Sequence, residues 1–400
     1  MYNLTNRTIL LGVTGGIAAY KAVDLASKLT QAEALVEVVM TAEATRFVAP
    51  LTFAGVTGRS VHSEMFAAEG GPAEVHVELG RRAEAMVIAP ATATMIARLA
   101  LGLAEDMVSL TALATTAPLV ICPAMDSVMF EKEATQTNLT MLKRRGALIV
   151  GPDVGRLASG LMGAGRLVET EQIMGAVRFA LGAALGDYGG RKVVVTAGGT
   201  QEPIDPVRYL ANRSSGKMGY AVAEAARDRG ASVVLVSGPT ALPRPYGIDL
   251  RSVERATQMS EAVIAACEGA DLLVMAAAVA DYQPAEMAQQ KLKRGKSEME
   301  LSLVKTPDIL ASVDGREGLI KVGFAAESEN LRQNARKKLE KRGVHMIVAN
   351  DVTREGSGFG TDTNEVILFD ATGETELPPM SKYEVAQRIL DKARTWLAGG

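Results

Sequence analysis

The sequence is poor in cysteine, in aromatic residues and in long apolar runs. Only two cysteines, Cys122 and Cys267, occur in 400 residues, which excludes a disulfide framework and predicts a cytoplasmic location. Aromatic residues make up 4% of the chain, so we expect a core of Ala, Val, Leu and Ile. No stretch reaches about 18 uninterrupted apolar residues, so we expect no membrane span. Residues 1–13 lack a basic region followed by a long apolar run, so they predict a first strand and not a signal peptide.

Net charge is also small, while glycine is abundant. Lys and Arg number 43 against 46 Asp and Glu, a formal net charge of −3. This balance gives no general attraction to nucleic acid or to an anionic membrane, so any phosphate binding has to be local. Many of the 39 glycines stand at predicted strand ends. That distribution is typical of α/β folds whose backbones approach phosphates.

The length predicts two domains, because 400 residues exceed one ordinary domain. Short apolar runs alternate with helical patterns along both halves, which favours parallel sheets. The turn-rich sequence GDYGGRK, residues 186–192, marks the boundary between them. We therefore assign residues 1–188 and 189–400 to two fused α/β domains.

The predicted elements alternate in both halves. In the first half we expect strands at 8–13, 35–40, 86–89, 119–122 and 147–150, and helices at 17–30, 92–101, 131–145 and 171–185. In the second half we expect strands at 192–196, 232–236, 272–275, 321–323, 345–348 and 365–369, and helices at 217–229, 307–313 and 330–341. The Gly-rich stretch 151–169 has no clear period, which indicates a functional loop or lid.

The segment GVTGGIAAYK, residues 12–21, joins the first strand to the first helix. Its glycines let a ligand approach the backbone, and the helix N-terminus offers free N–H groups to a phosphate. It matches neither the dinucleotide fingerprint nor the P-loop, so a phosphate site and a simple tight turn remain equally open. Further strand ends carry Thr41, the APAT turn at 89–92 and Ser109, where ligands of open α/β sheets collect.

His76 stands in AEVHVELG, just before a predicted apolar strand. An imidazole suits proton transfer near neutral pH, yet a lone histidine is more often structural, so both interpretations remain open at this point. His62 and His345 lack comparable surroundings, and we interpret both as structural or solvated.

The second half carries three polar features at strand ends. Residues 214–217, Ser-Ser-Gly-Lys, form either a phosphate cradle at a helix N-terminus or a Ser-capped helix start. A P-loop is rejected because position 211 is Ala. Asp281 directly follows an apolar strand and predicts a Mg²⁺ or ribose contact, or else a cap. Lys291 and Lys293 would neutralise a triphosphate if they faced one, and are otherwise part of a solvated loop.

Four ordered motifs of the first half, GVTGGIAAYK, HVELG, APAT and PAMDSVMF, resemble the flavin-dependent cysteine decarboxylase family. They are most similar to its phosphopantothenoylcysteine decarboxylase members. The resemblance implies a flavodoxin-like three-layer fold that binds FMN between subunits, typically in trimers. It also implies that FMN oxidises the thiol-bearing carbon, that carbon dioxide then leaves, and that the hydride is returned. His76 matches the family's catalytic histidine, and the FMN-binding positions would be Gly15, Gly16, Ile17, Thr41, Ala91, Thr92 and Ser109.

Two residues depart from this family's pattern. Asp126 stands where relatives usually have the Asn that contacts the substrate carboxylate, and an ionised Asp would repel that group. Ser159 stands where relatives usually have a Cys that donates a proton from the Gly-rich flap. A hydroxyl is a much weaker acid than a thiol, so Ser159 would either pass on a proton from elsewhere or slow the last half-reaction.

The second half resembles the phosphopantothenate–cysteine ligase family, through DPVRYLANRSSGKMG, MAAAVADYQP, VKTPDIL and VGFAAE. The resemblance implies a Rossmann-like domain in which CTP, with Mg²⁺ at Asp281, activates 4'-phosphopantothenate as an acyl-cytidylate that cysteine then attacks. Asn212 would hold the intermediate and Lys291 would assist its formation. The nucleotide-binding positions would be Ala277, Asp281, Lys291, Pro307, Asp308, Ile309, Leu310, Phe324, Lys338 and Arg342.

Together the two resemblances predict a bifunctional enzyme of coenzyme A biosynthesis. Its product would be 4'-phosphopantetheine, and its partners small molecules, without nucleic acid or membrane. Dimeric ligase domains joined to trimeric decarboxylase domains would form a homo-dodecamer. Two alternatives remain: a working ligase with a flavin-binding module that does not decarboxylate, and a decarboxylase of another peptidyl-cysteine, against which the fused ligase argues.

Overall fold

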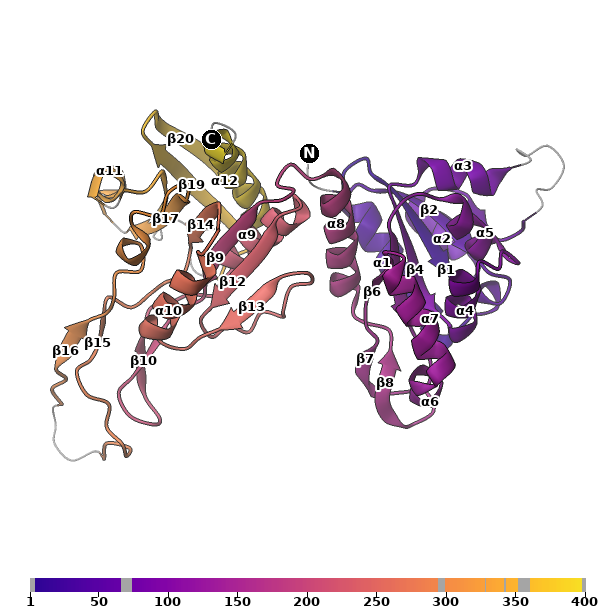
Figure 1. Cartoon of the computed structure of the whole chain (residues 1–400), viewed down its shortest axis with the longest axis horizontal. Helices are drawn as coiled ribbons and strands as arrows, with labels where there is room; N and C mark the ends of the chain where they lie inside the picture. The colour runs from indigo at the N-terminus through magenta and orange to yellow at the C-terminus, as the bar shows by residue number, and fades with distance from the viewer. Residues whose placement is uncertain are drawn as a thin grey trace. The chain divides into compact units, whose positions relative to one another are not determined.

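The computed structural model describes residues 4–65, 74–293, 299–327, 329–341, 343–351 and 360–397 (Figure 1). The chain forms two compact units, Met1–Gly186 and Asp187–Gly400. Within the described ranges, no helix is both long enough and apolar enough to cross a membrane.

The first unit alternates strands and helices from end to end. Its strands are β1 (Thr8–Val13), β2 (Leu35–Met40), β3 (Val61–His62), β4 (Ala85–Ala91), β5 (Leu119–Pro123), β6 (Leu148–Ile149), β7 (Asp153–Arg156) and β8 (Met162–Arg166). Its helices are α1 (Lys21–Gln31), α2 (Pro50–Thr57), α3 (Val75–Arg82), α4 (Ala93–Leu101), α5 (Met107–Ala114), α6 (Ser127–Glu131), α7 (Glu133–Arg144) and α8 (Thr170–Leu185), with 3-10 turns η1 (Ile17–Tyr20) and η2 (Ala44–Arg46).

A parallel sheet of order β3-β2-β1-β4-β5-β6 forms the middle layer of this unit. Helices α1, α2 and α8 cover one face, and α3, α4, α5 and α7 cover the other. The central strands are apolar on both sides, as in β1, where Ile9 to Val13 are all buried, because helices cover both faces of the sheet. The predicted flavodoxin-like three-layer fold is confirmed.

The second unit has a larger, mixed sheet. Its strands are β9 (Lys192–Ala197), β10 (Gln201–Pro203), β11 (Tyr209–Ala211), β12 (Ser232–Ser237), β13 (Asp249–Ser252), β14 (Leu272–Met275), β15 (Tyr282–Pro284), β16 (Leu303–Lys305), β17 (Ile320–Glu327), β18 (Met346–Asp351), β19 (Thr363–Asp370) and β20 (Gly373–Ser381). Its helices are α9 (Lys217–Asp228), α10 (Ala256–Ala266), α11 (Leu331–Lys341) and α12 (Lys382–Leu397), with the 3-10 turn η3 (Ala311–Val313).

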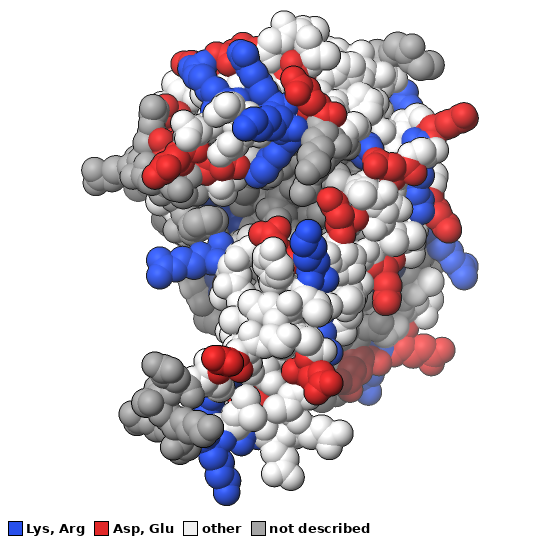
Figure 2. All heavy atoms as spheres, turned by 90° about the vertical axis from the view of Figure 1, so that its left-hand side faces the viewer, with Lys and Arg blue, Asp and Glu red and all other residues white. Residues whose placement is uncertain are grey.

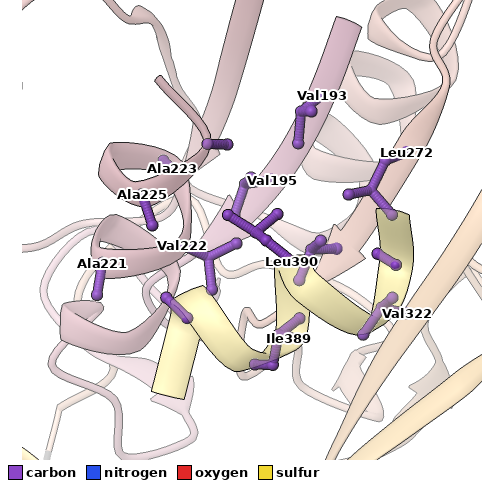
Figure 3. Packing of buried hydrophobic residues seen from close by; sticks show 14 of the residues in the cluster. Val193, Val195, Ala221, Val222, Ala223, Ala225, Leu272, Val322, Ile389 and Leu390 are labelled. Atoms are coloured by element: carbon purple, nitrogen blue, oxygen red, sulfur yellow. The ribbon is translucent and has the colours of Figure 1, made fainter. Parts of the chain in front are cut away.

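The main sheet of this unit has the order β13-β12-β9-β14-β17-β18-β19-β20. The strands from β13 to β18 are parallel, whereas β19 and β20 are antiparallel. One face packs against α9 and α12 through side chains such as Val195, Val222 and Ile389 (Figure 3). The other packs against α10 and α11. The predicted α/β fold with parallel strands is confirmed, and the antiparallel strands β19 and β20 extend the sheet beyond its parallel part.

Two short hairpins, β10–β11 and β15–β16, lie outside the main sheet and project from one end of the second unit (Figure 1). They flank the strand-end loops that carry the predicted ligase residues. Several of their side chains are large, apolar and exposed, including Val207, Tyr209, Tyr282, Leu303 and Val304.

Three local predictions were wrong. Residues 151–169 are not an irregular loop, because β7 and β8 form an antiparallel hairpin within them. His76 does not precede a strand directly but lies in the first turn of α3. The helix predicted at 307–313 is reduced to η3, because Thr306 ties this segment to the loop after β14: its N–H donates to the Asp281 carbonyl and its hydroxyl donates to the Ala280 carbonyl.

Candidate active sites

The carboxyl ends of β2, β1 and β4 meet at one edge of the first sheet. Thr14, directly after β1, donates a hydrogen bond to the Pro90 carbonyl at 2.6 Å and accepts one from the Thr92 N–H at 3.2 Å. The strand order reverses between β1 and β4, and open α/β sheets bind their ligands at such a switch point. Gly15, Gly16, Thr41, Ala91 and Thr92 all stand at this edge.

The turn after β1 offers the groups that a flavin nucleotide needs. Helical hydrogen bonding starts with Ala19, whose N–H donates to the Gly16 carbonyl at 2.9 Å. The N–H groups of residues 16–18 therefore precede the helical pattern and point from the N-terminal end, where a phosphate binds well. Ile17 is 66% exposed and gives this turn an apolar surface. Packing requires glycine at position 15, since a Cβ there would lie 2.4 Å from Cβ of Glu43.

Two predicted FMN contacts have side chains already engaged within the protein. Ser109 is buried and closes a capping box with Asp106 at the start of α5, each accepting a backbone N–H of the other. Thr41 is buried and accepts the Ala44 N–H at 3.2 Å. A contact between these side chains and FMN stays a prediction.

The β7–β8 hairpin folds over the segment after β5. The Met125 N–H donates to the Gly165 carbonyl at 3.0 Å, and a Cβ on Gly165 would lie 2.1 Å from the Met125 carbonyl oxygen. Such close docking requires glycine at position 165. Backbone contact with the neighbouring segment thus explains the glycine at position 165.

Asp126 and Ser159, the two departures from the family pattern, contact each other. The Ser159 hydroxyl donates to Oδ2 of Asp126 at 2.5 Å, while Oδ1 accepts the Val128 N–H at 3.0 Å and caps α6. Both hydrogen bonds favour the charged form, that from Ser159 most, and they hold the pKa of Asp126 below its usual value. One carboxylate therefore fastens the hairpin to the N-terminus of α6.

His76 lies away from this pair. In Figure 1, α3 is at the upper end of the first unit, and α6 with the β7–β8 hairpin is at its lower end. Among the described residues, the imidazole has no hydrogen-bond or ion-pair partner. A single copy of the chain thus does not bring His76 to Asp126 and Ser159.

In the second unit, hydrogen bonds join the loops that follow β9 and β14. The Ala277 N–H donates to Oγ1 of Thr196 at 3.1 Å, and the Ala280 N–H donates to Oγ1 of Thr200 at 3.0 Å. Asn212, after β11, donates from Nδ2 to the Val279 carbonyl at 3.0 Å. The structure therefore places Ala277 and Asn212 at the same sheet edge.

Asp281 and Lys291 lie on the adjoining segment, and both are exposed. Within the described part of the chain, no group of three or more Asp, Glu, His or Cys side chains could hold a metal ion. Mg²⁺ commonly takes one or two protein carboxylates and completes its shell with substrate phosphates and water. A single exposed carboxylate such as Asp281 fits that mode.

The remaining predicted nucleotide contacts differ in what they can offer. Pro307 and Asp308 are accessible, but Ile309 and Leu310 are buried core residues, so any contact from these two is through the backbone. Phe324 is half-buried against the core on β17. Arg342 lies outside the described residues.

Lysines 217 and 338 are both engaged in ion pairs. Lys338 donates to Oε1 of Glu327 at 2.8 Å. Lys217 donates to Oδ1 of Asp362 at 2.6 Å, so in this arrangement it does not serve the cradle formed by residues 214–216. On the face shown in Figure 2, Lys and Arg side chains gather near α11, with Asp and Glu beside them.

The chain is similar to known proteins over almost its whole length. Residues 1–181 match the family described as Flavoprotein, and residues 188–397 match the DNA/pantothenate metabolism flavoprotein C-terminal domain. The coenzyme A biosynthesis bifunctional protein CoaBC of Vibrio vulnificus is 43% identical over 400 residues, 99% of each chain. The chain belongs to the CoaBC family. CoaBC of Bacillus subtilis is 43% identical over 97% of each chain. A crystal structure of a CoaBC C-terminal domain is 40% identical, covers 53% of this chain and 98% of its own, and has a TM-score of 0.46.

One CoaBC-family segment holds a residue to which the sequence assigned no role. In DPVR, Asp205 has no solvent-accessible side-chain surface and accepts three backbone N–H groups. Burial tends to raise the pKa of Asp205, but the N–H groups of Val207, Leu292 and Arg208 outweigh it, and the pKa is lowered. Asp before Pro is a common turn start, which could have directed attention to this side chain.

Proposed function

We propose that the chain carries out two consecutive steps of coenzyme A synthesis. The second unit would join cysteine to 4'-phosphopantothenate with CTP, and the first would decarboxylate the resulting 4'-phosphopantothenoylcysteine with FMN. The observation that carries the proposal is the match to CoaBC proteins over 99% of the chain, with both family domains in order. It supports this interpretation over a ligase joined to a non-decarboxylating flavin module.

In the ligase step, a carboxylate oxygen of 4'-phosphopantothenate would attack the α-phosphorus of CTP, and pyrophosphate would leave. The cysteine amine would then attack the acyl carbon and release CMP. Lys291 would offset the charge that develops on the leaving group. Asp281 and the phosphates would hold Mg²⁺, which would supply further positive charge when bound. Asn212 is held through its amide nitrogen by Val279, so its side-chain oxygen remains to orient the acyl-cytidylate.

In the decarboxylation step, bound FMN would supply a two-electron acceptor and donor, which a cysteine carboxylate needs before it can lose carbon dioxide. The free N–H groups of residues 16–18 would hold its phosphate. His76 would hold or move a proton at its imidazole. Asp126 and Ser159 would close the hairpin over the substrate, with the hydroxyl oriented by the carboxylate.

A homo-oligomer follows from the same proposal. In one copy, α3 with His76 lies away from α6 and the β7–β8 hairpin with Asp126 and Ser159 (Figure 1), and this separation supports a decarboxylase site completed by a second copy. Large apolar side chains on the first unit are exposed as subunit contacts would require, and they include Tyr20, Leu51, Val154 and Met162. With apolar hairpins on the second unit, trimeric and dimeric contacts would build a dodecamer. The low cysteine content predicts a cytoplasmic location, and this stays a prediction.

The test is product analysis by mass spectrometry. Purified protein is given 4'-phosphopantothenate, cysteine, CTP and Mg²⁺, with FMN added. We expect 4'-phosphopantetheine and carbon dioxide. If the reaction stops at 4'-phosphopantothenoylcysteine, the decarboxylase assignment is wrong and the flavin module is non-catalytic. If CTP is not consumed, the ligase assignment is wrong.

A further inference from the structure

The turn between β10 and β11 is built around the buried carboxylate of Asp205. Its Oδ1 accepts the N–H groups of Val207 at 2.8 Å and Arg208 at 2.9 Å. This is the usual way in which an Asp closes a turn two and three residues ahead of it. One oxygen of the carboxylate is sufficient for this turn.

The second oxygen reaches a distant segment. Oδ2 of Asp205 accepts the N–H of Leu292 at 3.2 Å, and Nη2 of Arg208 donates to the Leu292 carbonyl at 2.9 Å. The Ala288 N–H also donates to the Ile204 carbonyl at 3.0 Å. Both backbone groups of Leu292 are therefore held by the β10–β11 turn, although Leu292 belongs to the excursion between β15 and β16.

Leu292 stands directly beside Lys291. That lysine is exposed, so its position depends on the peptide from which it extends. The same turn continues through β11 to Asn212, which donates to Val279. The frame held by Asp205 thus links the segment that carries Lys291 to the segment that carries Asn212. Fixing groups before the reaction lowers the entropy that the transition state would otherwise cost.

We propose that Asp205 is a positioning residue of the ligase reaction, which fixes through Leu292 the peptide that presents Lys291 to the phosphates of the nucleotide. The inference rests on the role proposed above for Lys291. In this proposal the buried Asp205 touches no reactant, and it acts through Lys291, which does.

The Asp205→Asn variant separates the turn from the distant contact. Its side-chain oxygen can still accept the N–H groups of Val207 and Arg208, but its NH₂ then faces the N–H of Leu292, so two donors meet. Asp249→Asn is the matched control, because Asp249 is an exposed carboxylate that pairs with neighbouring Arg251. Leu292→Pro is a second probe, since proline lacks the donor and leaves Asp205 unchanged.

The measurement is pyrophosphate release by the full-length protein with 4'-phosphopantothenate and saturating CTP. We expect kcat to fall about 10- to 100-fold in Asp205→Asn, with the KM for CTP nearly unchanged. Leu292→Pro should show a similar loss, and Asp249→Asn should match the wild type. Decarboxylation of supplied 4'-phosphopantothenoylcysteine should be normal in all three, because it belongs to the first unit. An unchanged KM for CTP serves as the check that the second unit is folded.

The decisive comparison adds Asp205→Asn to Lys291→Gln. If Asp205 acts through Lys291, the double variant should be no more than about twofold slower than Lys291→Gln alone. Independent, multiplied losses would overturn the positioning role, and so would full activity of Asp205→Asn beside an impaired Lys291→Gln. Full activity of Lys291→Gln would instead remove the proposed role of Lys291, and the positioning role with it.

Discussion

The candidate residues of the two units are held in different ways. In the second unit, one chain ties the loops after β9 and β14, Asn212 and the segment of Lys291 into a hydrogen-bonded frame. In the first unit, α3, which carries His76, lies at the opposite end from α6 and the β7–β8 hairpin, which hold Asp126 and Ser159 (Figure 1). A fold can therefore carry all the expected residues of a site without assembling them in one copy.

A decarboxylase site shared between two copies can be tested by mixing variants. Where a site takes residues from two copies, defects in different residues can complement each other in a mixed oligomer. The ligase activity provides an internal reference, because it resides in the other unit and should not respond to changes in the first.

The largest effect is expected from His76→Asn and Gly165→Ala. Each should abolish decarboxylation, the first by removing the imidazole and the second by displacing the hairpin, where a Cβ would meet Met125. Co-expressed, the two variants should recover about a quarter of wild-type activity, because random pairing restores one interface in four. Release of carbon dioxide from supplied 4'-phosphopantothenoylcysteine measures this.

Ligase activity is the control in this experiment, and it should be unchanged in every sample. No recovery in verified mixed oligomers would mean that both residues serve within one copy. Normal carbon dioxide release by His76→Asn alone would remove that histidine from the mechanism.

Lys291→Gln tests the other side of the comparison. Losing one cation beside the leaving group should slow pyrophosphate release roughly 100-fold at saturating CTP, the usual loss for one electrostatic contact. Lys293→Gln is the matched control for loop charge, and we expect it to lose only a few-fold. Equal losses in the two variants would indicate that net charge matters and the position of Lys291 does not.

Buried apolar strands were the most predictable part of the fold. Residues 8–13 and 272–275 were assigned with both ends correct, because continuous apolar runs are typical of strands covered on both faces. Strand β20 was missed because it is an edge strand with mostly exposed residues and two prolines, Pro378 and Pro379, which only an edge tolerates. The helix α3 was missed because it is short, and half of its eight residues are polar.

The site was predictable as a set of residues and not as an arrangement. Sequence motifs indicated Asp126 and Ser159 separately, 33 residues apart. They predicted that Asp126 would repel the substrate carboxylate and that Ser159 would be a weak proton donor. Their contact depends on how the β7–β8 hairpin docks, which no local pattern encodes. The same holds for Asp205 and Leu292, which are 87 residues apart.

The Asp126–Ser159 contact predicts coupled effects of smaller size. Asp126→Ala and Ser159→Ala should each slow decarboxylation about 3- to 10-fold, which corresponds to about 0.7 to 1.4 kcal/mol, the net contribution of one typical hydrogen bond. The double variant should be no slower than the worse single variant, because both changes remove the same contact. Multiplied losses would show that the two residues act independently.

The smallest effect concerns the titration of Asp126. The hydrogen bond from Ser159 is the main cause that lowers the pKa of this carboxyl group, so Ser159→Ala should raise the pKa back toward its usual value. Because a lowered pKa means that the contact favours the carboxylate, the contact persists at neutral pH and is lost as the pH falls through that pKa. Isotope-edited infrared titration can follow the Asp126 carboxyl, with Asp126→Asn to assign its band. An unchanged midpoint in Ser159→Ala would mean that the hairpin is not fastened by this hydrogen bond in solution.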